Sequence, residues 1–215
     1  MDRRTDLNDV TPRRGFFTRV AASVMAIGLT GLGPVAARAA AGAEDGPDWP
    51  GTLKGRHRQV VDAYAANDGF PLAFAFTFVA TNGPASAGIV PATAVVVLRH
   101  TAFPLALDHT MWQKYKIGER WKIADPATKQ PAVRNIFLSE GDLSVKAMQA
   151  RGTAFWQCNV ALGAIAQQLA QAAGMPAADV RADLIAGLNP GVHLVPAHVM
   201  AIGIAQEHGF TYMKA

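Results

Sequence analysis

The chain contains one cysteine, Cys158, which stands where a short apolar run gives way to a helix-like run. The thiolate form of cysteine is both a nucleophile and a ligand for soft metals. At the first turn of a helix, unpaired N–H groups and the helix dipole favour that form. Sγ of Cys158 is therefore the first candidate for a reactive atom, with an inert and buried thiol as the alternative.

Three more side chains with useful chemistry fall beside predicted strand ends. His100 follows an apolar run that ends at Leu98, His198 follows a run that ends at Val195, and Asn159 comes directly after the cysteine. In open α/β sheets ligands bind beyond the carboxyl ends of the strands, so we expect all three residues on the edge that carries Cys158. An imidazole there could move a proton, and Asn159 could either stabilise the thiolate or cap the helix.

The elements that must position these residues alternate between strand and helix. The run from Ala92 to Leu98 is apolar at consecutive positions, as expected of a strand covered on both faces. We predict further strands at 57–63, 154–157, 192–195 and 210–213, and helices at 71–81, 102–114, 139–150, 159–173, 177–186 and 197–208. The sequence therefore predicts an α/β domain over residues 56–215, with a mostly parallel sheet and helices on both faces.

One segment does not fit this alternation. Residues 115–137 mix Gly, Pro, Lys, Arg and Asp with scattered aromatic residues, which is long for a loop inside a compact domain. We expect it to serve as a functional lid or as an oligomer contact.

The N-terminus has the pattern of an export signal. Arg13 and Arg14 precede an apolar pair, and no charged residue interrupts the stretch from Ala21 to Ala37. The arginine pair resembles a twin-arginine (Tat) signal, and a small-residue cleavage pattern follows at residues 37–39. We therefore predict a Tat-type signal peptide at 1–39, a flexible linker at 40–55, a periplasmic location for the mature chain, and no stable membrane span after cleavage.

Cleavage would also change the charge of the protein. It removes six of 20 basic and three of 16 acidic residues, which leaves 14 and 13, so the mature chain is nearly neutral. Without a basic cluster, nucleic-acid binding is not expected. A single cysteine also excludes an intramolecular disulfide, so the core alone must stabilise the exported fold.

Several familiar chemistries lack their motifs. The sequence has no Cys-x-x-Cys pair, no Gly-x-Gly-x-x-Gly after a strand, no phosphate loop and no Gly-x-Ser-x-Gly elbow. No cofactor is predicted.

From residue 152 onward the order of features resembles the DsrE/DsrF-like sulfur-relay family. The resemblance spans about residues 56–213, with 115–137 as an insertion, and it rests on a strand that ends in the cysteine followed by several short motifs. These motif residues are Cys158, Asn159, Ala161, Leu162, Leu188, Pro190, Gly191, Val192, Val195, Pro196, Ala205, Gln206, Glu207, Gly209 and Tyr212.

The resemblance implies a flavodoxin-like three-layer domain that forms homo-oligomers. In sulfur-transferring members, the cysteine that matches Cys158 carries sulfur as a persulfide. Two features of this chain depart from that pattern: the export signal, and His198 near the predicted site.

We therefore expect an exported thiol protein that handles sulfur, with Asn159 and the helix start stabilising the thiolate and His100 or His198 moving the proton. Two alternatives are a binding module in which Cys158 and a histidine hold a soft metal, and a structural oligomer subunit with an inert thiol.

Overall fold

The computed structural model describes residues 50–83 and 91–215, so the predicted signal peptide and most of the linker lie outside it. In the described part, five parallel strands form one sheet in the order β4-β3-β2-β1-β5. The strands are β1 (His57–Ala65), β2 (Ala92–Thr101), β3 (Ala154–Cys158), β4 (Val192–Val195) and β5 (Thr211–Lys214). The predicted α/β class with a parallel sheet is confirmed.

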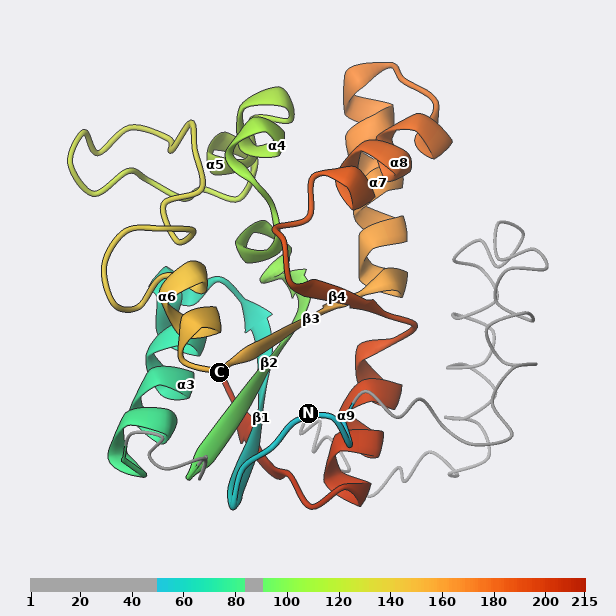
Figure 1. Cartoon of the computed structure of the whole chain (residues 1–215). Helices are drawn as coiled ribbons and strands as arrows, with labels where there is room; N and C mark the ends of the chain where they lie inside the picture. The colour runs from blue at the N-terminus through green and yellow to red at the C-terminus, as the bar shows by residue number, and fades with distance from the viewer. Residues whose placement is uncertain (1–49, 84–90) are drawn as a thin grey trace, which may run out of the picture. The chain divides into compact units, whose positions relative to one another are not determined.

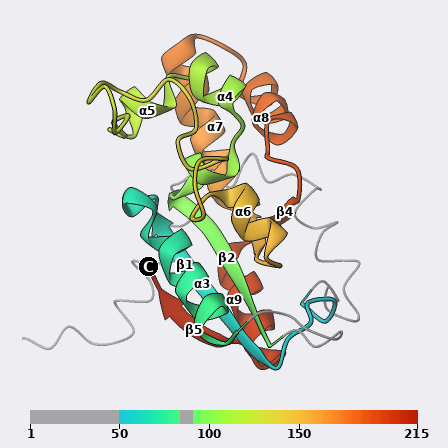
Figure 2. The ribbon, with the colours of Figure 1, turned by 60° about the vertical axis from the view of Figure 1, so that its left-hand side comes forward.

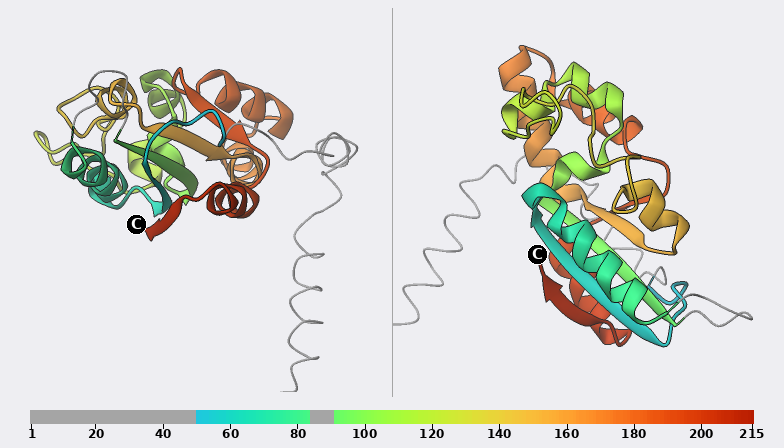
Figure 3. Two further views of the ribbon diagram at one scale, coloured as in Figure 1. Left: turned by 60° about the horizontal axis from the view of Figure 1, so that its bottom comes forward. Right: turned by 90° about the vertical axis from the view of Figure 1, so that its left-hand side faces the viewer.

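Helices cover both faces of this sheet, as Figures 1, 2 and 3 show. α3 (Phe70–Thr81) and α6 (Val145–Ala150) lie on one face, and α9 (His198–Glu207) lies on the other. Beyond the carboxyl edge stand α4 (His109–Lys114), α5 (Ile117–Arg120), α7 (Asn159–Ala173) and α8 (Ala177–Ala186), with short 3-10 turns η2 (Asn67–Gly69) and η3 (Phe103–Ala106).

The central strand β2 buries side chains on both faces because its apolar residues are consecutive. Val96 and Leu98 pack into the core beneath α3 and α6, whereas Val95 and Val97 pack into the core beneath α9. All four are fully buried. The continuous apolar run that predicted a central strand therefore supplies both cores at once.

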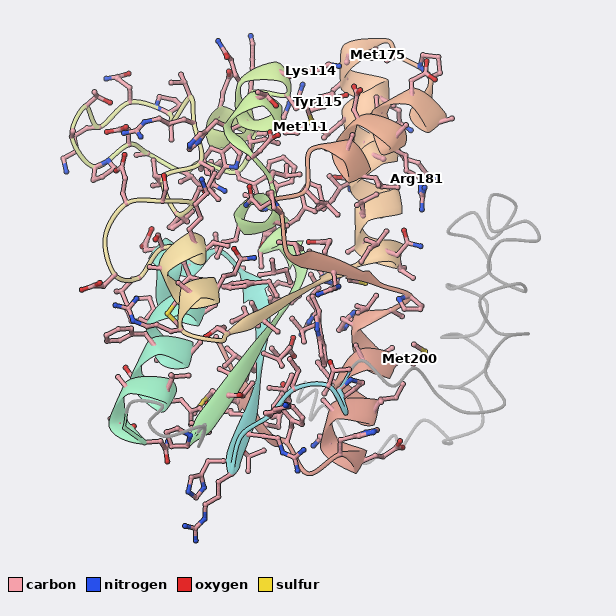
Figure 4. All side chains as sticks on the ribbon, in the orientation of Figure 1. Met111, Lys114, Tyr115, Met175, Arg181 and Met200 are labelled. Carbon is pink, nitrogen blue, oxygen red and sulfur yellow. The ribbon has the colours of Figure 1, made fainter. Side chains whose placement is uncertain are left out.

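The predicted insertion is a structured segment. Buried Asn135 donates from Nδ2 to the carbonyl of Leu107 at 2.6 Å, and its Oδ1 accepts from the N–H of Phe137 at 2.9 Å. At the start of the segment, Tyr115 donates from its hydroxyl to Asp183 of α8 at 2.6 Å, and Figure 4 shows the tyrosine on the side of α4 that faces α7 and α8. Buried polar contacts of this kind fix one conformation.

Two predicted helices differ from the observed ones by more than two residues. The helix expected from Ser139 begins instead at Val145, where Ser144 accepts the N–H of Ala147, because Gly141 has a left-handed φ of 73° that a helix does not allow. The helix expected at 102–114 is divided into η3 and α4, since Leu107 is extended and Asp108 caps a new start.

The described start of the domain is packed. Leu53 lies against the core beneath α9, and the carbonyl of Lys54 accepts from the hydroxyl of Thr93, so the part of the predicted linker at 50–55 belongs to the domain. Among the described residues, none of the helices is long and apolar enough to cross a membrane.

Candidate functional site

Cys158 and His198 occupy neighbouring strand ends at a point where the connections change face. Cys158 is the last residue of β3, whose neighbour β4 ends at Val195 in register with it, and His198 then begins α9. The connection from β4 covers the face opposite to α3 and α6, while β3 leads into α7 beyond the edge. Ligands of open α/β sheets bind at such a switch point.

The sulfur of Cys158 has three polar neighbours. It accepts the N–H of Ala161 and the N–H of His198, each at 3.4 Å, and it lies 3.6 Å from Nδ1 of His198. Cys158 is itself the N-cap residue of α7. Two N–H groups aimed at one sulfur, beside a helix N-terminus, stabilise negative charge on it. We name Cys158 and His198 the thiol corner.

The imidazole of His198 is held in its neutral form. Partial burial lowers the pKa of His198 below its ordinary 6.5, and repulsion from Arg99 and His100 lowers it further, against the attraction of Asp62. At neutral pH the ring therefore has one nitrogen that can accept a proton. Its Nδ1 faces the thiol, so this ring can take the thiol proton.

His100 lies next to His198 at the same edge of the sheet, but its ring does not contact the sulfur of Cys158. It is the penultimate residue of β2, which runs three residues past the predicted end, and its φ is 47°. Its ring stacks on Tyr64 at 4.7 Å between centroids and meets the ring of His198 edge-on at 6.1 Å. Of the two predicted histidines, His198 is therefore the one in contact with the thiol.

Asn159 is engaged elsewhere. Its Oδ1 accepts a hydrogen bond of 2.7 Å from Arg181 of α8, which Figure 4 shows on the outer side of α7 and α8. The cap of α7 that we had considered for Asn159 is made by Cys158 instead. The structure gives Asn159 a role in joining α7 to α8.

A second polar group at the same edge was not predicted. Arg99 donates to Asp62 from Nε at 2.7 Å and from Nη2 at 3.0 Å, and the hydroxyl of Tyr212 donates to the same carboxylate at 2.9 Å. Burial alone would raise the pKa of Asp62, but the hydrogen bonds from Arg99 and Tyr212 and the arginine charge hold it below its usual value. We name these three residues the ion-pair corner.

The sequence holds one feature that could have predicted the pairing of Asp62 with Arg99. Asp62 is a lone carboxylate in an apolar strand, and it pairs with Val97 of the neighbouring strand. Arg99 stands two residues after Val97 and so lies on the same face of the sheet. Same-face residues of adjacent strands are within reach of long side chains.

A pocket of about 850 Å³ opens beside the thiol corner. Cys158, His198 and His100 line one part of it, and the insertion lines another. The remaining walls come from α7 and from the end of β1. The full lining is Tyr64, Ala65, Ala66, Asn67, Asp68, His100, Thr101, Arg120, Trp121, Lys122, Ile123, Phe137, Cys158, Val160, Ala161, Ala164, Ile165, Gln168, Leu169 and His198. The insertion therefore forms part of the wall around the candidate site.

Metal coordination has weaker support. Within residues 50–83 and 91–215, no three side chains of His, Cys, Asp or Glu are grouped closely enough to hold an ion. Cys158 and His198 lie close enough to share one, but a stable soft-metal site normally has three or four protein ligands.

The comparisons with known proteins leave the family open. No protein-family model and no curated protein matches the chain. Among solved structures, it is similar to the protein of unknown function MTH1491 from Methanobacterium thermoautotrophicum, at 15% identity and a TM-score of 0.40, over 74% of this chain and 100% of that chain. This likeness assigns neither a family nor an activity.

Proposed function

We propose that the chain is an exported sulfur-handling protein in which Cys158 carries sulfur as a persulfide. The main support for this proposal is the set of contacts that the sulfur makes. Two N–H groups donate to it, Nδ1 of a neutral imidazole lies beside it, and a pocket opens next to it. The resemblance to the sulfur-relay family around Cys158 adds support, and the export signal predicted at residues 1–39 supports a periplasmic location.

The chemistry needs no outside oxidant if the donor is a sulfane-sulfur compound. His198 takes the proton of the thiol, and the thiolate attacks the outer sulfur of thiosulfate. A new bond joins Sγ of Cys158 to that sulfur, the donor S–S bond breaks, and sulfite leaves with its electron pair. An acceptor such as cyanide can then attack the outer sulfur, which forms thiocyanate and returns the thiolate.

In this reaction the groups around the sulfur have separate roles. The N–H groups of Ala161 and His198 hold the thiolate and the persulfide anion, and the His198 ring manages the proton. Arg120 and Lys122, elsewhere in the pocket lining, give the pocket a positive charge that attracts an anionic donor from solution. Asp68 is the one carboxylate among the lining residues.

Intact-mass spectrometry tests this function. The purified chain is treated with thiosulfate or an organic persulfide, and we expect a gain of one sulfur that is removed by cyanide. The Cys158→Ser variant should gain nothing, and His100→Gln, which leaves the thiol contacts in place, should still gain it. If the wild type gains no sulfur from either donor, the proposal is wrong.

Two other results would point to the alternatives. A bound soft metal on the protein purified from its export compartment, lost in both Cys158→Ser and His198→Gln, would favour a metal-binding module. A thiol that resists alkylation until the protein is unfolded would favour a structural subunit.

A further inference from the structure

The pocket beside Cys158 is much larger than an inorganic sulfur donor requires. Its volume of about 850 Å³ falls in the range of sites that hold whole organic ligands, roughly 300–1,000 Å³. Thiosulfate would fill only the part beside the thiol. The remaining space needs another explanation.

The shape of the pocket follows from α7. The helix contributes Val160 and, at the spacing that places residues on one face of a helix, Ala161, Ala164, Ile165, Gln168 and Leu169. Cys158 caps the start of the same helix. At a rise of 1.5 Å per residue, the wall from position 158 to position 168 is about 15 Å long. The pocket therefore extends from the thiol along two to three turns of helix.

The chemical character of the lining changes along this length. The α7 wall is largely apolar, and Trp121, Ile123 and Phe137 of the insertion add apolar surface. Arg120 is the last residue of α5, and Lys122 follows two residues later. α5 stands away from the carboxyl edge of the sheet, at the level of the later turns of α7 (Figure 1). The two cations thus belong to the end of the pocket remote from the thiol.

These cations are available to a ligand. Among the described ion pairs, none includes Arg120 or Lys122. Arg120 donates from Nε to the carbonyl of Tyr115, and no carboxylate of residues 50–83 or 91–215 forms an ion pair with its guanidinium. Asp68, the acidic lining residue, stands in the turn after β1, on the sheet-edge side. An anion is therefore favoured at the α5 end of the pocket.

We infer that the pocket binds an elongated organic anion, with its acidic group at Arg120 and Lys122, an apolar body along α7, and its other end at Cys158. Where that end bears a persulfide, the ligand is the natural sulfur donor to the thiol, and where it bears a thiol, the ligand is the acceptor; this last point alone rests on the proposed function. Transfer from an organic persulfide is balanced, because the outer sulfur moves to Cys158 and the organic thiolate leaves with the electron pair.

Calorimetric titration of the Cys158→Ser variant with octanoate tests the pocket without the thiol. We expect octanoate to bind, butyrate to bind more weakly by about fourfold for each methylene removed from the apolar wall, and neutral octanamide to bind more weakly than octanoate. Ala164→Phe, which places a ring in the pocket, should abolish binding. Ala182→Phe, at an exposed helical alanine of α8 outside the lining, should not change it.

A matched lysine pair tests the charged end. Lys122 and Lys129 are both exposed insertion residues with left-handed φ, of 55° and 59°, and only Lys122 is in the lining. Lys122→Gln should weaken octanoate binding by about two- to fivefold, and Lys129→Gln should leave it unchanged.

The outcomes separate the two proposals. If Cys158→Ser does not bind octanoate, or binds octanamide equally well, the elongated-anion site is wrong, whatever the wild type does with thiosulfate. If octanoate binds as expected while the wild type gains no sulfur, the pocket stands and the sulfur chemistry fails.

Discussion

The thiol corner and the ion-pair corner lie on the same edge of one sheet, yet their polar groups are arranged differently. In the ion-pair corner, the carboxylate of Asp62 receives two hydrogen bonds from Arg99 and one from Tyr212. In the thiol corner, the sulfur of Cys158 faces an imidazole that is neutral at physiological pH, and both line a pocket.

This difference separates a structural polar group from a reactive one. Removal of one partner from a buried ion pair leaves an uncompensated charge and lowers the stability of the fold. A nucleophile that has a base beside it and an open approach can instead form a new bond. We therefore expect changes in the ion-pair corner to alter stability first, and changes in the thiol corner to alter reactivity first.

The largest stability effect should come from Asp62→Ala. It leaves the guanidinium of Arg99, whose side chain is only 15% exposed, without its partner, and we expect a loss of about 3 kcal/mol in the free energy of unfolding. Urea unfolding monitored by circular dichroism measures it.

Asp142→Ala is the matched control, because Asp142 pairs with Arg151 but is 79% exposed. It should cost less than about 1 kcal/mol. Equal losses for the two variants would mean that the ion-pair corner has no special structural weight.

The largest reactivity effect, apart from loss of the thiol, should come from His198→Ala. Removal of the base that lies 3.6 Å from the sulfur should slow sulfur uptake by Cys158 about a hundredfold at neutral pH. The rate is followed by intact mass at fixed thiosulfate concentration.

His100→Ala provides the comparison, since this ring touches that of His198 but has no contact with the sulfur. We expect a change of less than about threefold, in keeping with a positioning contact. If the two histidine variants slow the reaction equally, the proton role cannot be assigned to His198.

A smaller stability effect should follow from Tyr212→Phe. The change removes one hydrogen bond to the Asp62 carboxylate from a half-exposed side chain, and should cost about 1 kcal/mol. The double variant with Asp62→Ala, measured by urea unfolding, should lose much less than the sum of both changes. Additive losses would show that the hydroxyl acts independently of the carboxylate.

The smallest effect should be a difference in the pH range over which His198 and Asp62 each contribute to stability. The pKa of His198 is below 6.5, so its share of stability is complete above pH 6.5 and is lost as the pH falls through its folded value. The pKa of Asp62 is below 3.8, so its share is lost only at more acidic pH. Plots of the free energy of unfolding against pH for the wild type and His198→Gln should differ in slope just below pH 6.5 and run parallel above it. A difference in slope above pH 6.5 would contradict the assignment to His198.

Much of the fold was predictable because the apolar pattern is unambiguous. The helices 159–173 and 177–186 and the strand 192–195 agree with the observed bounds, since Gly174, Pro176 and the apolar runs mark their ends. The strand-edge rule also predicted correctly that Cys158, His198 and His100 would come together, because parallel strands bring their carboxyl ends to one edge.

What could not be predicted depends on contacts between distant segments. The bond from Asn159 to Arg181 needs the angle between α7 and α8, and the pocket wall from the insertion needs the anchor at Asn135. Neither leaves a periodic signal in the sequence. The boundaries at Ser144 and Asp108 were missed because several capping residues stand close together and only backbone geometry selects among them.

Cys158 is only 1% exposed, yet we propose that it is a reactive thiol reached through the pocket. The direct measurement is the rate of alkylation by iodoacetamide in the native protein and in urea, at pH 7, with a bulky maleimide as a second reagent. We predict that native Cys158 reacts with iodoacetamide at least as fast as the unfolded thiol and much more slowly with the maleimide. A native thiol that resists both reagents and reacts only after unfolding would contradict a reactive role for Cys158.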